Sequence, residues 1–270
     1  MTPTISRRSC LAGIACLASG STLLSGCATT QGKSKDYVLI HGAWHGSWAW
    51  DAVKPLLEKP GTRVLAPTLK GLAERQDENG PNVTLETHIA EVVALLDSEH
   101  LNNIVLVGHS YAGFVVTGVC DRRPERIAHV VYLDAFVPES GQKVYDYVKP
   151  AERVQQMRAD TRNRGQGYRS FPPPAANWGL SGELMDYVNK RMTPHPAMTN
   201  EEPILLTRGG PCAVPRRTYI DCTQPAMPPF IETKARIKKD ARWNYLSVSA
   251  GHEVSLTHPQ LVADLLTNLS

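Results

Sequence analysis

Short apolar runs alternate with amphipathic stretches over the first half of the chain. Each run is rich in β-favouring residues and is bounded by turn-forming or polar residues; the runs cover residues 37–40, 63–66, 103–108 and 128–133. An unbroken apolar run of this length is typical of a strand covered on both faces. Residues 84–96 carry apolar side chains at helical spacing behind Thr84 as a cap, and a second helical segment covers about 112–120. The alternation predicts an α/β fold with a mostly parallel sheet and helices on both faces.

The alternation stops between residues 138 and 202. This stretch holds a charge-rich helical segment at 151–162 and several prolines. Strand-like and helical patterns then resume, at residues 218–220, 245–248 and 259–269. We therefore predict one core from residues 36–137 and 203–270, with 138–202 inserted as a cap over the carboxyl edge of the sheet, where α/β folds bind ligands. A disordered linker is the alternative, but the stretch contains large apolar side chains that can pack, namely Phe171, Trp178, Met185 and Tyr187.

The N-terminal segment has the pattern of an export signal. The pair Arg7-Arg8 precedes a short run of small and apolar residues that ends at Leu24-Ser25-Gly26-Cys27. The run is shorter than the roughly 20 residues that a membrane span needs. The arginine pair resembles a twin-arginine signal, and the last four residues resemble a bacterial lipobox. We therefore predict a signal peptide over 1–27, with Cys27 lipidated as the first mature residue, a linker over 28–35, and an exported protein that is periplasmic or a membrane-anchored lipoprotein.

The charge balance and the cysteine content limit which partners, disulfides and metal sites are expected. Arg7 and Arg8 leave with the signal, so 27 of the 29 Lys and Arg residues stand against 26 Asp and Glu, a balance that gives no reason to expect a nucleic-acid partner. Three of the six cysteines lie in the N-terminal segment, which leaves Cys120, Cys212 and Cys222. A disulfide between Cys212 and Cys222 and buried free thiols are both compatible with the sequence. No cysteine pair has zinc-finger spacing with histidines, so we expect no structural metal.

A serine lies at the turn from a predicted strand into a predicted helix. Ser110 follows the run 103–108 in the motif Gly108-His109-Ser110-Tyr111-Ala112-Gly113. Small residues two before and two after the serine let the chain turn sharply and project the hydroxyl above the sheet edge, as a nucleophile elbow requires. Ala112 replaces the usual second glycine, but a methyl group crowds the turn only mildly and Gly113 adds slack. The motif predicts that Ser110 is a nucleophile.

A serine nucleophile needs a base, and the oxyanion that forms needs amide donors. His252 lies in the loop after the last predicted strand, where the chain order nucleophile, acid, histidine places the base. Tyr111, at the start of the helix, supplies one expected oxyanion donor. Ala43, beside Gly42 in the loop that leaves the first strand, supplies the other.

These motifs together resemble one branch of the α/β-hydrolases, the plant methylesterases and hydroxynitrile lyases with their bacterial esterase relatives. The likeness runs from about Tyr37 to the C-terminus and rests on the stretches Val38 to Trp48, Gly108 to Tyr111 and Gly251-His252. It implies the α/β-hydrolase fold, a Ser-His-Asp triad and no cofactor. The lyases of this family carry a hydroxyl residue and a lysine where this chain has Gly42 and Glu253. A cyanide leaving group would lack its positive partner, so hydrolysis is favoured over lyase chemistry.

The acid of the triad is not where the resemblance places it. The plant esterases have it soon after a Cys-Thr pair, whereas Cys222-Thr223 is followed here by Gln224-Pro225. Asp134, after the strand 128–133, occupies a position that resembles the acid of haloalkane dehalogenases, and we favour it. Asp221, after 218–220, is the runner-up. An ordinary strand-end aspartate that caps a loop is the alternative for both.

We therefore expect a carboxylic ester hydrolase that acts on a small-molecule ester through an acyl-enzyme. Aromatic residues near the motifs suggest an apolar or aromatic group in the substrate; the candidate binding residues are Trp44, His109, Phe136 and Trp178. A hydroxynitrile lyase and a ligand-binding protein without turnover are the competing hypotheses. The choice among esters, amides and lactones depends on the placement of cap side chains.

Overall fold

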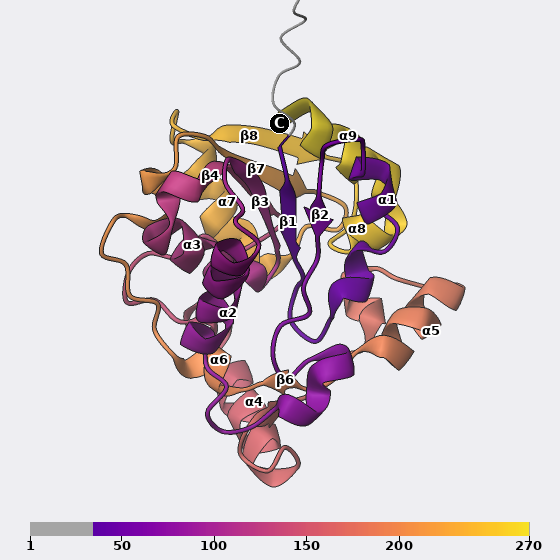
Figure 1. Ribbon diagram of the computed structural model, residues 1–270. Helices are drawn as coiled ribbons and strands as arrows, with labels where there is room; N and C mark the ends of the chain where they lie inside the picture. The colour runs from indigo at the N-terminus through magenta and orange to yellow at the C-terminus, as the bar shows by residue number, and fades with distance from the viewer. Residues whose placement is uncertain (1–34, 270) are drawn as a thin grey trace, which may run out of the picture. The chain divides into compact units, whose positions relative to one another are not determined.

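Six parallel strands form the sheet of this computed structural model, which describes residues 35–269 (Figure 1). The strand order is β2-β1-β3-β4-β7-β8, and each neighbouring pair is parallel. The strands are β1 Tyr37–Ile40, β2 Val64–Leu65, β3 Ile104–His109, β4 Ile127–Leu133, β7 Arg217–Cys222 and β8 Asn244–Val248. The prediction of a parallel α/β sheet is confirmed.

Helices cover both faces of the sheet because successive strand residues point to opposite sides. On one face, Val38 and Ile40 of β1 pack in the core cluster that contains α2 (Leu85–Ser98) and α3 (Ala112–Arg122). On the other, Tyr37 and Leu39 pack with residues of α1 (Lys54–Leu57) and α9 (Pro259–Leu269). The apolar runs are therefore unbroken because both of their faces are buried.

The predicted cap of helix α2 is present. The hydroxyl oxygen of Thr84 accepts the backbone N–H of Thr87 at 3.4 Å, and the Thr87 hydroxyl accepts the N–H of Thr84 at 3.1 Å. This reciprocal pair satisfies two donors that a helix start leaves free.

One core helix was not predicted. Helix α7 (Ile231–Lys238) connects β7 to β8, as two adjacent parallel strands require, since they cannot be joined by a tight turn. Its short length and its charged residues hide the helical period, although Ile237 enters the same core cluster as α2 and α3. This helix also brings Lys234 to the site described below.

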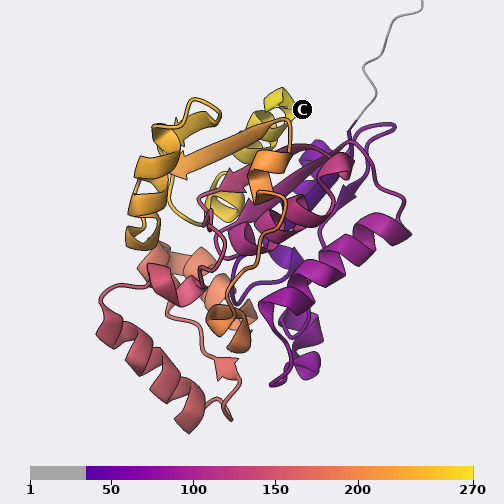
Figure 2. The same cartoon turned by 90° about the vertical axis from the view of Figure 1, so that its left-hand side faces the viewer.

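Residues 138–202, here named the cap segment, lie beyond the carboxyl ends of the strands (Figures 1 and 2). They contain α4 (Ala151–Asn163), α5 (Gly182–Arg191), α6 (Met198–Glu201) and a two-stranded antiparallel sheet of β5 (Arg169–Ser170) and β6 (His195–Pro196). Trp178, Leu180 and Val188 of the segment share a buried cluster with Trp48 and Ala49 of the core. The segment therefore packs as a folded layer over the sheet edge.

The remaining short elements lie mostly in the connecting loops. Helix α8 (Val254–Thr257) precedes α9, and the 3-10 helices are Ser47–Trp50, Ala73–Glu78, Pro124–Arg126, Val144–Tyr147, Ala175–Trp178, Gly210–Ala213 and Pro228–Phe230. Within residues 35–269, none of the helices has the length and apolar character needed to cross a membrane. The predicted signal peptide and Cys27 lie outside the described residues.

The three cysteines of the described chain are free thiols. Cys120 and Cys222 are buried and Cys212 is exposed. The disulfide between Cys212 and Cys222 is therefore not formed, and the alternative of buried free thiols holds for Cys120 and Cys222 but not for Cys212.

Candidate active site

Ser110 lies at the sharp turn between β3 and α3. Its φ of 56° is in the left-handed region that non-glycine residues rarely adopt. A Cβ at Gly113 would lie 1.9 Å from the carbonyl oxygen of Phe136, so the chain needs a glycine there. The structure thus gives Gly113 a different role from the one predicted: it permits a close backbone approach rather than adding slack beside Ala112.

A hydrogen-bonded chain runs from Ser110 through His252 to Asp134. His252, in the loop between β8 and α8, has its Nε2 3.1 Å from the Ser110 hydroxyl oxygen. Its Nδ1 lies 2.6 Å from Oδ2 of Asp134, which follows β4. Because an ionised carboxylate only accepts hydrogen bonds, Nδ1 carries the proton and Nε2 is free to accept from the serine. This arrangement suits a serine nucleophile with a histidine base.

Asp134 is buried and ionised. Burial would raise the pKa of Asp134, but the hydrogen bond and charge of His252, followed by the charge of Lys234, hold that pKa below its usual value. Asp221, the other candidate, does not contact His252. Its carboxylate lies 2.6 Å from Nζ of Lys234 and accepts the Tyr245 hydroxyl at 2.7 Å. The structure brings Asp134, and not Asp221, to the imidazole.

Two backbone amides beside Ser110 have no acceptor within residues 35–269. They belong to Ala43 and Tyr111. The loop of Ala43 approaches the serine closely, since a Cβ at Gly42 would lie 3.2 Å from the Ser110 Cβ. Free amides at a helix start and in a glycine loop are the donors that an oxyanion requires.

His41 fixes the peptide that carries the Ala43 amide. The N–H of Leu69 donates to His41 Nε2 at 3.1 Å, so the ring proton is on Nδ1, which donates to the Gly42 carbonyl at 2.9 Å. Because the Gly42 carbonyl and the Ala43 N–H belong to one planar peptide, holding the carbonyl also orients the N–H. Full burial lowers the pKa of His41 to about 3, so the ring stays neutral.

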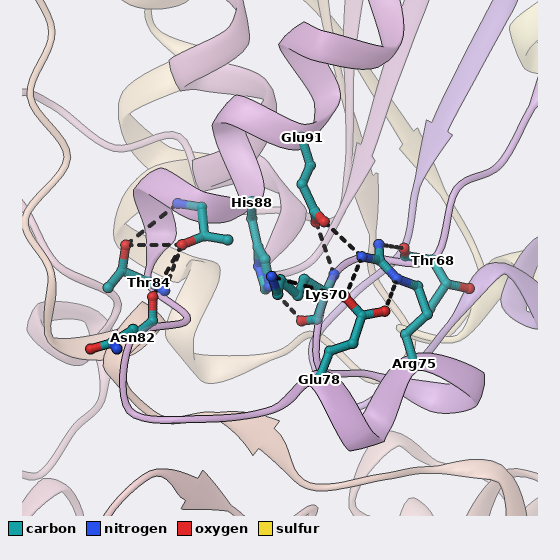
Figure 3. Close-up of polar contacts among 9 residues, drawn as sticks. Thr68, Lys70, Arg75, Glu78, Asn82, Thr84, His88 and Glu91 are labelled. Atoms are coloured by element: carbon teal, nitrogen blue, oxygen red, sulfur yellow. Dashed lines mark hydrogen bonds and ion pairs between the residues drawn. The ribbon is translucent and has the colours of Figure 1, made fainter.

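A polar network fixes the loop that contains Leu69 (Figure 3). Arg75 donates to the Thr68 carbonyl and to Glu91 at 2.8 Å each, and Glu91 also accepts the N–H of Lys70 at 2.9 Å. His88 Nε2 donates to the Lys70 carbonyl at 2.9 Å. The Tyr111 hydroxyl donates to His88 Nδ1 at 2.9 Å, so helix α2 links this loop to the residue after Ser110.

A cavity of about 560 Å³ opens over Ser110 between the core and the cap segment. Trp44, Tyr111, Phe136 and Trp178 line it, together with His252. His109 was expected to bind substrate but is not among the lining residues; it is buried and its Nε2 donates to the His252 carbonyl at 2.9 Å. Other lining residues carry no motif that predicts them from the sequence: Tyr145, the loop Pro225–Phe230 and two cations, Lys149 and Arg153.

The sequence profile of the alpha/beta hydrolase family matches residues 37–265. The chain belongs to this family. A carbendazim-hydrolysing esterase of Nocardioides sp. (strain SG-4G) is 37% identical over 243 residues, which cover 87% of this chain and 99% of that enzyme. Methylesterase 8 of Arabidopsis thaliana is 34% identical over 122 residues, 44% of this chain and 45% of the relative.

A solved structure of an α/β-hydrolase extends the match to the whole fold. An extracellular α/β-hydrolase from a Paenibacillus species, described as sharing structural and functional homology with tobacco salicylic acid binding protein 2, superposes with a TM-score of 0.75 at 26% identity. The match covers 87% of this chain and 98% of the other. The predicted family branch and the predicted enzyme class, an ester hydrolase, are confirmed.

Within this α/β-hydrolase, Glu253 is turned away from the cavity. The residue is buried, is not a lining residue, and faces His45, with 3.5 Å between Oε2 and Nε2. Burial would raise the pKa of Glu253, but the neighbouring imidazoles, His45 first, outweigh burial and lower that pKa overall. His45 Nδ1 in turn donates to the Ala43 carbonyl at 2.7 Å. Glu253, the residue after His252, therefore supports the Ala43 loop through His45 and does not line the cavity.

Proposed function

We propose that the protein cleaves carboxylic esters through an acyl-enzyme formed on Ser110. The observation that carries the proposal is the hydrogen-bonded chain Ser110–His252–Asp134 at the floor of the cavity, with distances of 3.1 and 2.6 Å. The two amides of Ala43 and Tyr111 that lack an acceptor in the described chain support it.

The proposed reaction has two halves. The Ser110 oxygen attacks the ester carbonyl while His252 Nε2 takes the hydroxyl proton, and the Ala43 and Tyr111 amides hold the oxyanion. His252 then gives the proton to the leaving alcohol, and the carbon–oxygen bond of the ester breaks. A water molecule attacks the acyl-serine with the same histidine as base, which releases the acid. Asp134 keeps the proton on Nδ1 and stabilises the imidazolium throughout.

Two competing functions are less well supported. A hydroxynitrile lyase would need a positive partner for cyanide near His252, and the next residue is the buried Glu253 facing His45. A binding protein without turnover has no need of a base hydrogen-bonded to its serine, yet His252 lies 3.1 Å from the Ser110 oxygen. Both observations favour hydrolysis.

A fluorophosphonate probe tests the central step. It forms a phosphonate ester with a serine oxygen, with loss of fluoride, only when a base activates the hydroxyl. We expect stoichiometric labelling, with the adduct on the peptide that contains Ser110 by mass spectrometry and no labelling of the Ser110→Ala variant. Absence of label on folded protein would contradict the proposal and favour the binding protein. Release of cyanide from mandelonitrile with no ester turnover would favour the lyase.

The cavity suggests an ester with an apolar or aromatic body and an anionic tail. The aromatic lining of the cavity suits the apolar part of such an ester. Lys149 and Arg153 are the lysine and arginine that line the cavity, and no carboxylate is among the lining residues. We expect an aryl ester with a terminal carboxylate to have a KM about fivefold lower than its carboxamide analogue at low salt. Double substitution with Lys149→Met and Arg153→Met should remove the difference, whereas Lys190→Met, on the exposed surface of α5, should keep it. An equal KM for both esters in the unmodified protein would contradict this preference.

Export of the enzyme is a further proposal. It rests on the Arg7-Arg8 pair and on the lipobox-like residues before Cys27. The extracellular Paenibacillus relative gives general support for export. Mass spectrometry of the membrane fraction tests it, since lipid on Cys27 adds a defined mass that a Cys27→Ala variant lacks.

A further inference from the structure

A lysine from helix α7 lies between the two aspartates that compete for the role of triad acid. Lys234 Nζ is 2.6 Å from Oδ1 of Asp134 and 2.6 Å from Oδ1 of Asp221, and it donates to the Cys222 carbonyl at 3.0 Å. One N–H of the ammonium group therefore donates to the Cys222 carbonyl, and the two carboxylates pair with its charge as ion pairs. The residue is buried, so these ion pairs are screened much less than pairs at the surface.

The lysine and the histidine share the carboxylate of Asp134, one oxygen each. Oδ2 accepts from His252, while Oδ1 faces Lys234 and accepts the Cys222 N–H at 3.3 Å. Rotation of the carboxylate would break both sets of contacts. Lys234 thus fixes the oxygen that His252 uses, although it does not touch the imidazole's hydrogen-bonding atoms itself.

Asp221 balances the charge of the lysine. Without it, the ammonium would stand opposite a single carboxylate and would compete with the imidazolium for the charge of Asp134. With it, two carboxylates share one ammonium, and one negative charge is left to stabilise the protonated histidine. The pKa of Lys234 is raised: burial alone would lower it, but the two carboxylates, Asp134 first, outweigh burial.

We propose that Lys234 and Asp221 are a positioning pair that holds the Asp134 carboxylate and sets the pH at which His252 becomes a base. The proposal rests on the proposed function of the Ser110–His252–Asp134 chain. It gives Asp221 a role in charge balance rather than as an alternative triad acid.

Other charged and titratable groups around His252 come from the neighbouring elements. Glu253 is adjacent in sequence and carries a negative charge, and it faces His45 from the loop after β1. His109 at the end of β3 lies beside the His252 ring, tilted by 37° with 4.6 Å between the ring centroids, but burial lowers the pKa of His109 to about 4, so it is neutral. Tyr245 of β8 reaches the network only through Asp221. The substitutions below leave all of these groups in place.

Opposite shifts of the rate–pH profile test the proposal. Asp221→Asn removes a negative charge and leaves the ammonium in place, so protonation of His252 becomes harder and the acid limb of kcat/KM moves to lower pH, by about one unit. Lys234→Met removes the positive charge, so the limb moves to higher pH by a similar amount. The double variant leaves the net charge unchanged. Its acid limb should therefore move by only a fraction of this shift.

Two controls keep the test decisive. Lys239→Met, on the exposed side of the same helix end, removes a cation without touching the network and should leave the limb in place. Lys234→Arg keeps the charge and should hold the limb close to that of the unmodified enzyme even if its different shape lowers kcat. If Lys234→Met fails to fold, two other results still test the proposal. These are the shift of the acid limb in Asp221→Asn and the pH of the acid limb in Lys234→Arg.

A titration that does not need turnover separates this inference from the proposed function. The ring proton of His252, assigned by its loss in His252→Gln, can be followed by NMR against pH in each variant. Opposite shifts with no ester turnover would support the pair and contradict the ester hydrolase. If the variants turn over the ester but neither the acid limb of kcat/KM nor the NMR titration of His252 moves, only the positioning role of Lys234 and Asp221 is contradicted. Lys234 would then be a structural lysine.

Discussion

Replacement of Ser110 by alanine is expected to lower kcat for an aryl ester by about a millionfold. The substitution removes only the oxygen that lies 3.1 Å from His252 and leaves the backbone at the turn unchanged. The Ala43 and Tyr111 amides stay in place, so a small residual rate above that of water should persist. The measurement is steady-state turnover, with the melting temperature to show that the variant is folded.

Ser181→Ala is the matched control for this variant. Ser181 precedes α5, its side chain makes no capping hydrogen bond, and it does not line the cavity. Its turnover should equal that of the unmodified protein. Retention of more than a hundredth of the activity in folded Ser110→Ala would exclude Ser110 as the nucleophile.

Substitution of Asp134 by asparagine is expected to lower kcat by about ten-thousandfold. An asparagine can present an N–H to His252 and favours the wrong tautomer, with Nε2 protonated and unable to accept the serine proton. It also no longer stabilises the imidazolium. The fold should survive, because the side chain keeps its shape and Lys234 retains Asp221 as a partner.

Comparison with two other aspartates makes this test specific. Asp186→Asn, exposed on α5, should leave turnover unchanged. Asp221→Asn, measured at the optimum pH of that variant, should lose much less turnover than Asp134→Asn. The reason is that Asp221 does not contact His252 and acts only through Lys234. A larger loss in Asp221→Asn than in Asp134→Asn would reverse the assignment of the acid.

The local pattern of the sequence determined the core of this protein. The apolar runs of β1, β3 and β4 could be predicted because a strand buried on both faces carries apolar residues without interruption. Ser110 and His252 could be predicted as candidate site residues because the turn at the serine and the loop after the last strand each have a local pattern. Helix α7 could not be identified, since half of its eight residues are charged and only its place between parallel strands demands it.

Only the tertiary structure decided which groups act together at the site. In sequence, Asp134 and Asp221 are both aspartates at strand ends, and the choice depends on which carboxylate reaches a histidine 118 residues away from Asp134. Lys234 looks like one surface lysine among several, and its burial between two carboxylates has no local signal. His109 adjoins Ser110 yet does not line the cavity, because strand geometry turns alternate side chains to opposite sides. Local patterns specify elements and turns, whereas charge pairing and cavity lining arise from contacts between residues far apart in the chain.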